Sequence, residues 1–311
     1  MRLGVMRRAT RFVPAAHSGW QTGTARAPAG IRLTALWRPE YRTARQSCQR
    51  KAAPRRVESG PGVEARMNAG TIEIQPGTAA YTLALVGAGE FLPSMRAVDE
   101  QLLTVSGGRR VAILPTASAP DGPEVFERWA AMGEAHFRAL GAQVEVVAAR
   151  TRADCLDPDI VRQIASVDLV YFSGGKPDYL LAALTQTPAW EAVLALLQRG
   201  GVVAGCSAGA MILGAFIPAF RLRQLPGRDA LWMPGFGLVP QAIVIPHFNE
   251  IPRSIVRAWL ALRPSGTRAF GVDAGTALVG RPGAWRVLGE GSVTLADGEG
   301  ECAYGAGEPF P

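Results

Sequence analysis

Short apolar runs alternate with segments of helical periodicity over residues 81–204 of the chain. Each run is nearly continuous in apolar residues, which is typical of strands that are buried on both faces of a parallel sheet. The predicted strands are 82–86, 111–114, 144–147, 167–172 and 201–204, and helical patterns lie around 94–104, 123–140, 157–165 and 187–199. This alternation predicts an α/β fold with a doubly wound, mostly parallel sheet.

The C-terminal part of the chain has a different pattern. An apolar run at 242–245 predicts one more strand, and glycine turns separate several shorter runs after it. These runs are 268–273, 276–280, 284–288 and 292–296. We interpret them as closing strands of the same domain, since no internal repeat marks a second one. We therefore expect one α/β domain over residues 78–311, preceded by a leader.

The leader, residues 1–77, differs in composition from the rest. Residues 1–66 contain 14 basic and three acidic side chains, whereas the remaining residues contain 19 basic and 23 acidic ones. Residues 1–66 therefore carry a net charge of +11 and the remaining residues −4, so the positive net charge of +7 comes from the leader. The slightly acidic domain argues against a nucleic-acid partner.

Two interpretations of the leader stay open, and under both we expect it to be disordered. Its acid-free, arginine-rich start has the composition of a mitochondrial transit peptide. Alternatively, the segment is a mis-assigned start and translation begins at Met67. We favour the second, because prolines and glycines interrupt any amphipathic face. The leader lacks the apolar core of a secretory signal.

The composition also bears on metal sites, membranes and cellular location. The four cysteines form no CxxC pair and have no regular spacing, so we predict neither a zinc site nor a disulfide framework. No stretch of about 20 apolar residues is present, so we expect no membrane span. We accordingly expect a cytoplasmic protein without metal or cofactor.

A candidate nucleophile, Ser207, lies in Gly205-Cys-Ser-Ala-Gly209, between a predicted strand and the helical segment 210–213. A GxSxG elbow exposes the serine hydroxyl, because its glycines permit a strained turn and close approach of the backbone. Two alternatives remain: a glycine-rich turn in which serine caps a helix, and Cys206 as the nucleophile. Cys206 is one residue off the centre of the motif and should point into the sheet.

The candidate general base is His247, at the carboxyl end of the predicted strand 242–245. Ligands of parallel α/β sheets bind beyond this edge. The other histidine after the leader, His136, lies in a helical pattern and is more easily explained by packing or surface exposure.

An orienting carboxylate completes such a site. Asp229 is the only acid between Ser207 and His247, so the order Ser, Asp, His selects it. A solvated loop aspartate is the alternative reading of Asp229, and Glu250 and Asp273 are the rival acids.

Backbone N–H groups are the expected donors to an oxyanion. Ala208 follows the nucleophile and supplies one. The pair Gly174-Gly175, after the strand 167–172, supplies a second, although such a pair can also be an ordinary turn between strand and helix.

Taken together, these segments resemble the cyanophycinase/dipeptidase E family of serine peptidases, a branch of the class I glutamine amidotransferase-like fold. The resemblance covers about residues 82–280 and rests on Val86-Gly-Ala-Gly-Glu90, Ile113-Leu-Pro-Thr-Ala-Ser118, Ser173-Gly-Gly175, Gly205-Cys-Ser-Ala-Gly-Ala210, Pro246-His-Phe248 and Gly271-Val-Asp273 with Thr276-Ala-Leu278. It implies that Ser207 is the nucleophile, His247 the base and Asp229, by position, the acid. It also implies an oxyanion pair of Gly175 and Ala208 and a metal-free site.

The departures from the family concern the substrate. Cyanophycinases have a glutamine after the glycine pair, where this chain has Lys176-Pro177. They also have Asp-Gln before His-Phe, where this chain has Ile245-Pro246. We therefore expect a peptidase acting on small peptides, with Gly89, Glu90 and Lys176 near the substrate. The alternatives are a non-peptidase amidase or esterase and a binding protein that retains the fold.

Overall fold

The structure is a computed structural model and describes residues 81–219 and 231–311. All of them belong to one compact unit, Arg56–Pro311. The leader expected over residues 1–77 lies outside the described residues, and so does the candidate acid Asp229.

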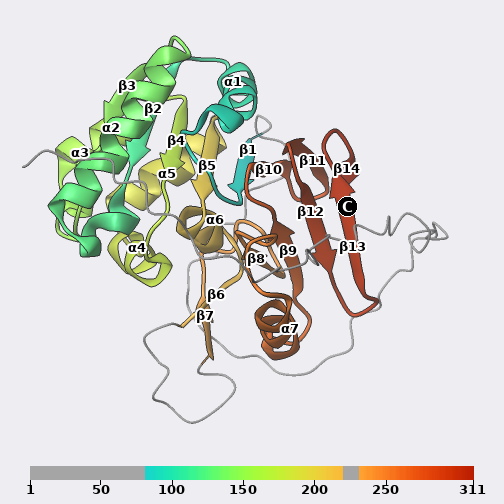
Figure 1. The fold of residues 1–311 in the computed structure, drawn as a ribbon. Helices are drawn as coiled ribbons and strands as arrows, with labels where there is room; N and C mark the ends of the chain where they lie inside the picture. Colours follow the sequence, from blue (N-terminus) through green and yellow to red (C-terminus); the bar gives the residue numbers. More distant parts are fainter. Residues whose placement is uncertain (1–80, 220–230) are drawn as a thin grey trace, which may run out of the picture. The chain divides into compact units, whose positions relative to one another are not determined.

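The centre of the fold is an eight-stranded sheet with the order β14-β11-β10-β1-β5-β4-β2-β3 (Figure 1). Its five parallel strands are β1 (Thr82–Val86), β2 (Arg110–Leu114), β3 (Gln143–Val146), β4 (Leu169–Phe172) and β5 (Val202–Cys206). β1, β4 and β5 are buried at every position, as strands covered on both faces must be. The predicted fold class and all five of these strands are confirmed.

Helices cover both faces of the sheet. On one face lie α1 (Arg96–Val105) and α2 (Pro123–Ala139); on the other lie α3 (Pro158–Ala165), α4 (Pro177–Leu184), α5 (Pro188–Gln198) and the short α6 (Ala208–Leu213). Proline at the first helical position and a capping side chain begin two of them. Asp157 accepts from the Asp159 N–H at the start of α3, and Thr187 accepts from the Trp190 N–H at the start of α5.

The C-terminal strands divide between two sheets, which the sequence did not predict. β10 (Thr276–Arg281), β11 (Ala284–Gly289) and β14 (Pro309–Phe310) extend the central sheet in antiparallel fashion. β8 (Ala242–Ile245), β9 (Arg268–Val272), β12 (Ser292–Ala296) and β13 (Glu301–Gly305) form a second sheet of their own. α7 (Arg253–Leu262) packs on this second sheet through Val256 (Figure 1). A separate hairpin joins β6 (Phe216–Pro218) to β7 (Trp232–Pro234).

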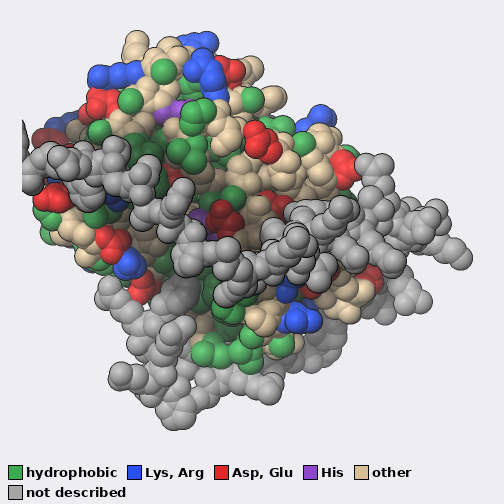
Figure 2. Space-filling model, viewed as in Figure 1, with side chains coloured by type: hydrophobic (Ala, Val, Ile, Leu, Met, Phe, Trp, Pro, Cys, Tyr) green, Lys and Arg blue, Asp and Glu red, His purple; other side chains and the backbone are tan. Residues whose placement is uncertain are grey.

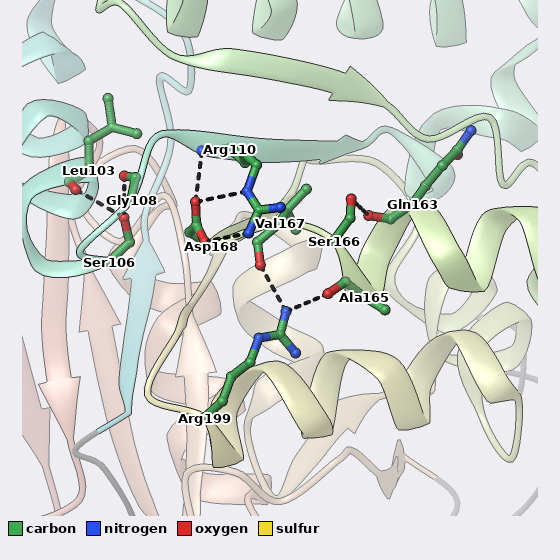
Figure 3. A network of polar contacts seen from close by, with 10 residues as sticks. All are labelled: Leu103, Ser106, Gly108, Arg110, Gln163, Ala165, Ser166, Val167, Asp168 and Arg199. Carbon is green, nitrogen blue, oxygen red and sulfur yellow. Dashed lines mark hydrogen bonds and ion pairs between the residues drawn. The ribbon is translucent and has the colours of Figure 1, made fainter.

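A polar network ties strands together at the amino-terminal edge of the parallel strands (Figure 3). The Asp168 carboxylate accepts from the Arg110 backbone N–H and from the Arg110 guanidinium, which it meets at 3.1 Å. Arg199 donates to the carbonyl oxygens of Ala165 and Val167. The opposite, carboxyl edge is the one where the candidate residues gather.

Candidate active site

The backbone at Ser207 is strained. Its φ of 51° and ψ of −110° are rare for a residue with a side chain, and α6 begins at the next residue. The two glycines of the motif allow this turn. An added Cβ at Gly205 would lie 2.3 Å from the Gly209 backbone, and one at Gly209 would lie 2.5 Å from the Phe172 carbonyl oxygen. The segment is thus the tight elbow between strand and helix that the sequence predicts.

His247 reaches the Ser207 side chain from the second sheet. It follows β8, and its Nε2 lies 3.1 Å from the Ser207 Oγ in a hydrogen bond between residues 40 positions apart. This is the separation that a nucleophile and its general base require. On the face drawn in Figure 2, a histidine side chain lies next to acidic side chains near the centre.

Among the described residues, Glu250 supplies the carboxylate that contacts His247. Its Oε2 lies 2.6 Å from the His247 Nδ1. The rival Asp273 is engaged elsewhere, because its Oδ2 accepts from the Ser292 N–H and hydroxyl. Asp229 lies outside the described residues, so its expected role stays a prediction.

Packing and hydrogen bonds hold the turn that carries His247. His247 has a φ of 53°, a left-handed conformation. The Phe248 N–H donates to the Val272 carbonyl, and the Phe248 ring lies where Gly271 has no side chain: an added Cβ there would be 2.3 Å from the ring. Asn249 Oδ1 accepts from the Ala274 N–H. Sequence reasoning missed these supports, because they depend on long-range neighbours. The sequence hint for Glu250 was its position three residues after the histidine.

The two predicted oxyanion donors belong to the turns after β5 and after β4. Ala208 is the first residue of α6, so its N–H has no acceptor within the helix. Gly175 has a φ of 143°, and an added Cβ would lie 2.3 Å from the Ala117 carbonyl oxygen, so only glycine fits this turn. The neighbouring Gly174 lies close to the nucleophile: an added Cβ there would be 3.3 Å from the Ser207 Cβ.

Glu90 lies next to the same turn but is buried, with 5% of its surface exposed. Its Oε1 accepts from the Gly174 N–H at 2.9 Å, and its Oε2 lies 3.0 Å from the Cys206 Sγ. The sequence-based expectation that Glu90 contacts substrate is therefore not supported, because the carboxylate faces the interior. Gly89 lies beside it with a φ of 86° and is partly exposed.

Lys176 lies at the start of α4, directly after the glycine pair. Its backbone N–H donates to the Ala117 carbonyl, and its half-exposed Nζ lies 2.8 Å from the Asp121 Oδ1. The ammonium group is thus close to solvent and is held by a carboxylate that is itself partly exposed.

The rival candidates Cys206 and His136 each contact a buried carboxylate, Glu90 and Asp99 respectively. Cys206 is fully buried, and burial together with the nearby Glu90 raises the pKa of its thiol well above the ordinary range. His136 Nε2 lies 2.8 Å from the Oδ2 of the buried Asp99 and belongs to the interface of α1 and α2. Burial, only partly offset by His136, raises the pKa of Asp99.

Two further features of the described residues concern metals and membranes. Within residues 81–219 and 231–311, no group of three or more His, Cys, Asp or Glu side chains is placed to hold a metal ion. In the same ranges, no single helix is long and apolar enough to cross a bilayer; α4 and α5 reach that length only together, with a 91° bend between them.

Comparison with known proteins gives a consistent result. Among curated proteins, a cyanophycinase from Nostoc sp. is 32% identical over 187 residues, which is 56% of this chain and 62% of the relative. A cyanophycinase from Synechococcus elongatus is 29% identical over 197 residues, 60% of this chain and 58% of the relative. The chain therefore matches somewhat less than two thirds of the length of these relatives.

A solved structure of a peptidase from an acI-B1 actinobacterium covers more of the fold. It is 34% identical, with a TM-score of 0.68, and the match spans 75% of this chain and 98% of that one. Residues 83–287 match the profile of peptidase family S51, and this range includes Ser207, His247 and Glu250. The chain belongs to peptidase family S51.

Proposed function

We propose that this protein is a serine peptidase that cleaves small peptides through an acyl-enzyme, with Ser207 as nucleophile, His247 as general base and Glu250 as the orienting acid. The observation that carries the proposal is the 3.1 Å hydrogen bond between the Ser207 Oγ and the His247 Nε2, made at a strained elbow. Membership of family S51 favours a peptide substrate over the amidase, esterase and binding-protein alternatives.

The hydrogen bonds of His247 fix its proton arrangement. A carboxylate only accepts hydrogen bonds, so the Nδ1 that faces Glu250 carries the ring proton. The Nε2 is then free to accept the hydroxyl proton of Ser207. Glu250 stabilises the imidazolium that forms, without itself taking up the proton.

The reaction then proceeds in two halves. The Ser207 oxygen attacks the scissile carbonyl while its proton moves to His247, and the C–O bond of a tetrahedral intermediate forms. Collapse breaks the C–N bond, and His247 gives its proton to the leaving amine. Water, deprotonated by His247, repeats the attack on the ester and releases the acid with Ser207 restored.

The negative charge of each tetrahedral intermediate develops between two backbone donors. We propose the N–H groups of Ala208 and Gly175 as these donors, because Ala208 follows Ser207 at the start of α6 and Gly175 follows Gly174, which lies against Ser207. Preorganised donors of this kind are worth about 100- to 1000-fold in kcat each.

The proposed substrates are small peptides, and Gly89 and Lys176 are the proposed contacts of this chain with them. The partly exposed Lys176 ammonium suits a carboxylate of the substrate in exchange for Asp121. Although the curated relatives in the comparison are named cyanophycinases, the replacement of their glutamine by Lys176-Pro177 argues against the same substrate here. A nucleic-acid partner is not proposed, and the cytoplasmic location stays a prediction.

The test combines hydrolysis with covalent labelling. We expect wild-type protein to hydrolyse members of a dipeptide and tripeptide panel and to react with a fluorophosphonate at Ser207, located by peptide mass spectrometry. Ser207→Ala should lose both reactions. Peptide hydrolysis that survives in Ser207→Ala would sink the proposal, and faster turnover of p-nitrophenyl esters than of any peptide would favour an esterase.

A further inference from the structure

One buried carboxylate joins three of the strand ends around the proposed site. Glu90 follows β1, and its two oxygens contact the turn after β4 and the end of β5. Oε1 accepts from the Gly174 N–H at 2.9 Å, one residue before the proposed oxyanion donor Gly175. Oε2 lies 3.0 Å from the Cys206 Sγ, one residue before Ser207.

We propose that Glu90 is a positioning residue of the peptidase, which fixes the distance between the Gly175 N–H and the Ser207 hydroxyl. This inference rests on the proposed function of the site. Glu90 does not touch the reacting atoms: it acts through the backbone N–H of Gly174 on one side and through the Cys206 side chain on the other.

The turn at Gly174 is closely packed against its neighbours. Gly174 packs directly on the carboxylate and the nucleophile, since an added Cβ would lie 2.9 Å from the Glu90 Oε1 and 3.7 Å from the Ser207 Oγ. The turn therefore lies against the side chains of both Ser207 and Glu90. A buried N–H that loses its acceptor is costly, so the turn would shift to find another.

The burial of Glu90 separates this role from substrate binding. The residue is 5% exposed and Cys206 is fully buried, so a bound peptide cannot replace either contact. The titratable groups near Glu90 are Asp99 and Tyr171. Both lie between the central sheet and the helices α1 and α2. Burial, with the nearby Asp99, Cys206 and Glu90, raises the pKa of the Tyr171 hydroxyl well above its ordinary range, so it stays protonated.

Two substitutions at Glu90 separate the effect of losing its hydrogen-bond acceptors from the effect of changing the volume of its side chain. Glu90→Gln keeps the shape and an oxygen that can accept from Gly174, and its amide can donate to the Cys206 sulfur. Glu90→Met keeps an unbranched side chain of similar length but removes both oxygens. Leu102→Ala serves as the matched control, because it opens a cavity at a fully buried position of α1 without touching the turn.

Steady-state kinetics on the best peptide then distinguish positioning from general destabilisation. We expect Glu90→Met to lower kcat about 100-fold with KM changed by less than about threefold, since the lost contacts set groups that act in the transition state. Glu90→Gln should restore most of that loss. Leu102→Ala should lower Tm at least as much as Glu90→Met and leave kcat within about twofold at temperatures where it is folded.

Three results would overturn the inference: wild-type kcat in folded Glu90→Met, a loss in Glu90→Gln as large as in Glu90→Met, or an equal loss of kcat in Leu102→Ala. If Glu90→Met does not fold, Cys206→Ala and Cys206→Ser replace it. Cys206→Ala removes the donor to Oε2 and should lower kcat several-fold, and Cys206→Ser should recover it; equal and unchanged kcat in both would contradict the proposal.

The same experiments include a check on the underlying function. Fluorophosphonate labelling of wild-type Ser207 measures the nucleophile without any peptide. Labelled, active wild type together with an unaffected Glu90→Met refutes only the positioning role. Wild type that neither labels nor hydrolyses peptides refutes the proposed function and this inference with it.

Discussion

At the scale of single residues, the contact between His247 and Glu250 is short but open to solvent. The distance is 2.6 Å, whereas the side chains are 40% and 56% exposed. An exposed contact of this kind contributes little to stability, because water competes for both polar groups. Its effect on catalysis is different, since it selects the tautomer and the ring orientation of His247.

We predict that Glu250→Gln lowers kcat on the order of 10- to 100-fold, with Tm almost unchanged. The loss is smaller than the roughly 10⁴-fold effect of a buried triad aspartate, because water can partly replace an exposed carboxylate. Steady-state kinetics and thermal unfolding of the same preparation measure the two effects.

The control substitutions distinguish the three acids. Asp273→Asn should leave kcat within about threefold, because that carboxylate contacts Ser292 rather than His247. Asp229→Asn tests the acid selected by chain order. A larger loss of kcat in Asp229→Asn than in Glu250→Gln would return the orienting role to Asp229.

The thiol beside the nucleophile allows a second prediction at this scale. Burial and the nearby Glu90 raise the pKa of Cys206 well above its ordinary range, so the thiolate is scarce at neutral pH. We expect iodoacetamide to leave Cys206 unmodified in native protein and to modify it fully after denaturation in guanidinium, as measured by peptide mass spectrometry. Modification of native Cys206 with loss of activity would reopen the cysteine alternative.

At the scale of secondary structure elements, the site depends on contacts between strand ends of the two sheets: Ser207 follows β5 of the central sheet, and His247 follows β8 of the second sheet. The turn after β8 carries His247 and is fixed against β9, where Gly271 leaves room for the Phe248 ring. A substitution in β9 should therefore alter the position of His247 relative to Ser207, although β9 does not contact Ser207 itself.

We predict that Gly271→Ala destabilises the protein by about 1–3 kcal/mol, the usual cost of overpacking, and lowers kcat more than tenfold. The added methyl group would displace Phe248 and with it His247. Gly298→Ala is the control, because an added Cβ there has no atom within 4 Å. Urea unfolding and kinetics of both variants make the comparison, and normal kcat in Gly271→Ala would contradict it.

The opposite edge of the sheet has its own pH dependence. Burial alone would raise the pKa of Asp168, but hydrogen bonds from Arg110 outweigh it and hold the pKa below its ordinary value of 3.8. A lowered pKa in the folded state contributes stability above the unfolded pKa, and that stability is lost as the pH falls through the folded pKa.

Asp168→Asn should therefore lower the free energy of unfolding by about 1 kcal/mol at pH 7, and the difference from wild type should shrink below about pH 4. Urea unfolding over this pH range measures it. The exposed pair Arg96–Glu100 provides the control, since Glu100→Gln should change stability by less than about 0.5 kcal/mol at any pH.

The sequence predicted the parallel half of the fold well, because buried strands such as β1 and β5 are continuous apolar runs with clear ends. It did not predict that β9 and β12 leave the central sheet, since strand partners depend on long-range packing. It selected Ser207 and His247 as candidates from local motifs, and the structure brings these two side chains into contact. It ranked Glu250 below Asp229, because chain order cannot reveal which carboxylate the fold brings to the histidine.

At the scale of the whole molecule, charge and chemistry are segregated along the chain. The basic excess lies in residues 1–66, whereas the matched family range is 83–287. All the described site residues fall within that range. The leader is thus expected to influence surface charge rather than catalysis.

We predict that a variant starting at Met67 has the same kcat/KM as the full chain within about twofold, although its net charge changes from +7 to −4. Kinetics on the best peptide measure kcat/KM, and retention on an ion-exchange column measures the change in net charge. A large loss of kcat/KM in the shortened chain would show that the leader contributes to the site.

The His247 turn is supported by β9, which follows it in the chain, and this order has a consequence for protein synthesis. Strand β1 pairs with β5 and β10, and Phe248 is held by Val272, so the groups around Ser207 come together only when strands distant in sequence have met. A nascent chain that ends before β9 already contains Ser207, His247 and Glu250, but it has no support for the histidine. Nascent chains are therefore expected not to cleave neighbouring polypeptides on the ribosome, because peptidase activity requires the complete tertiary structure.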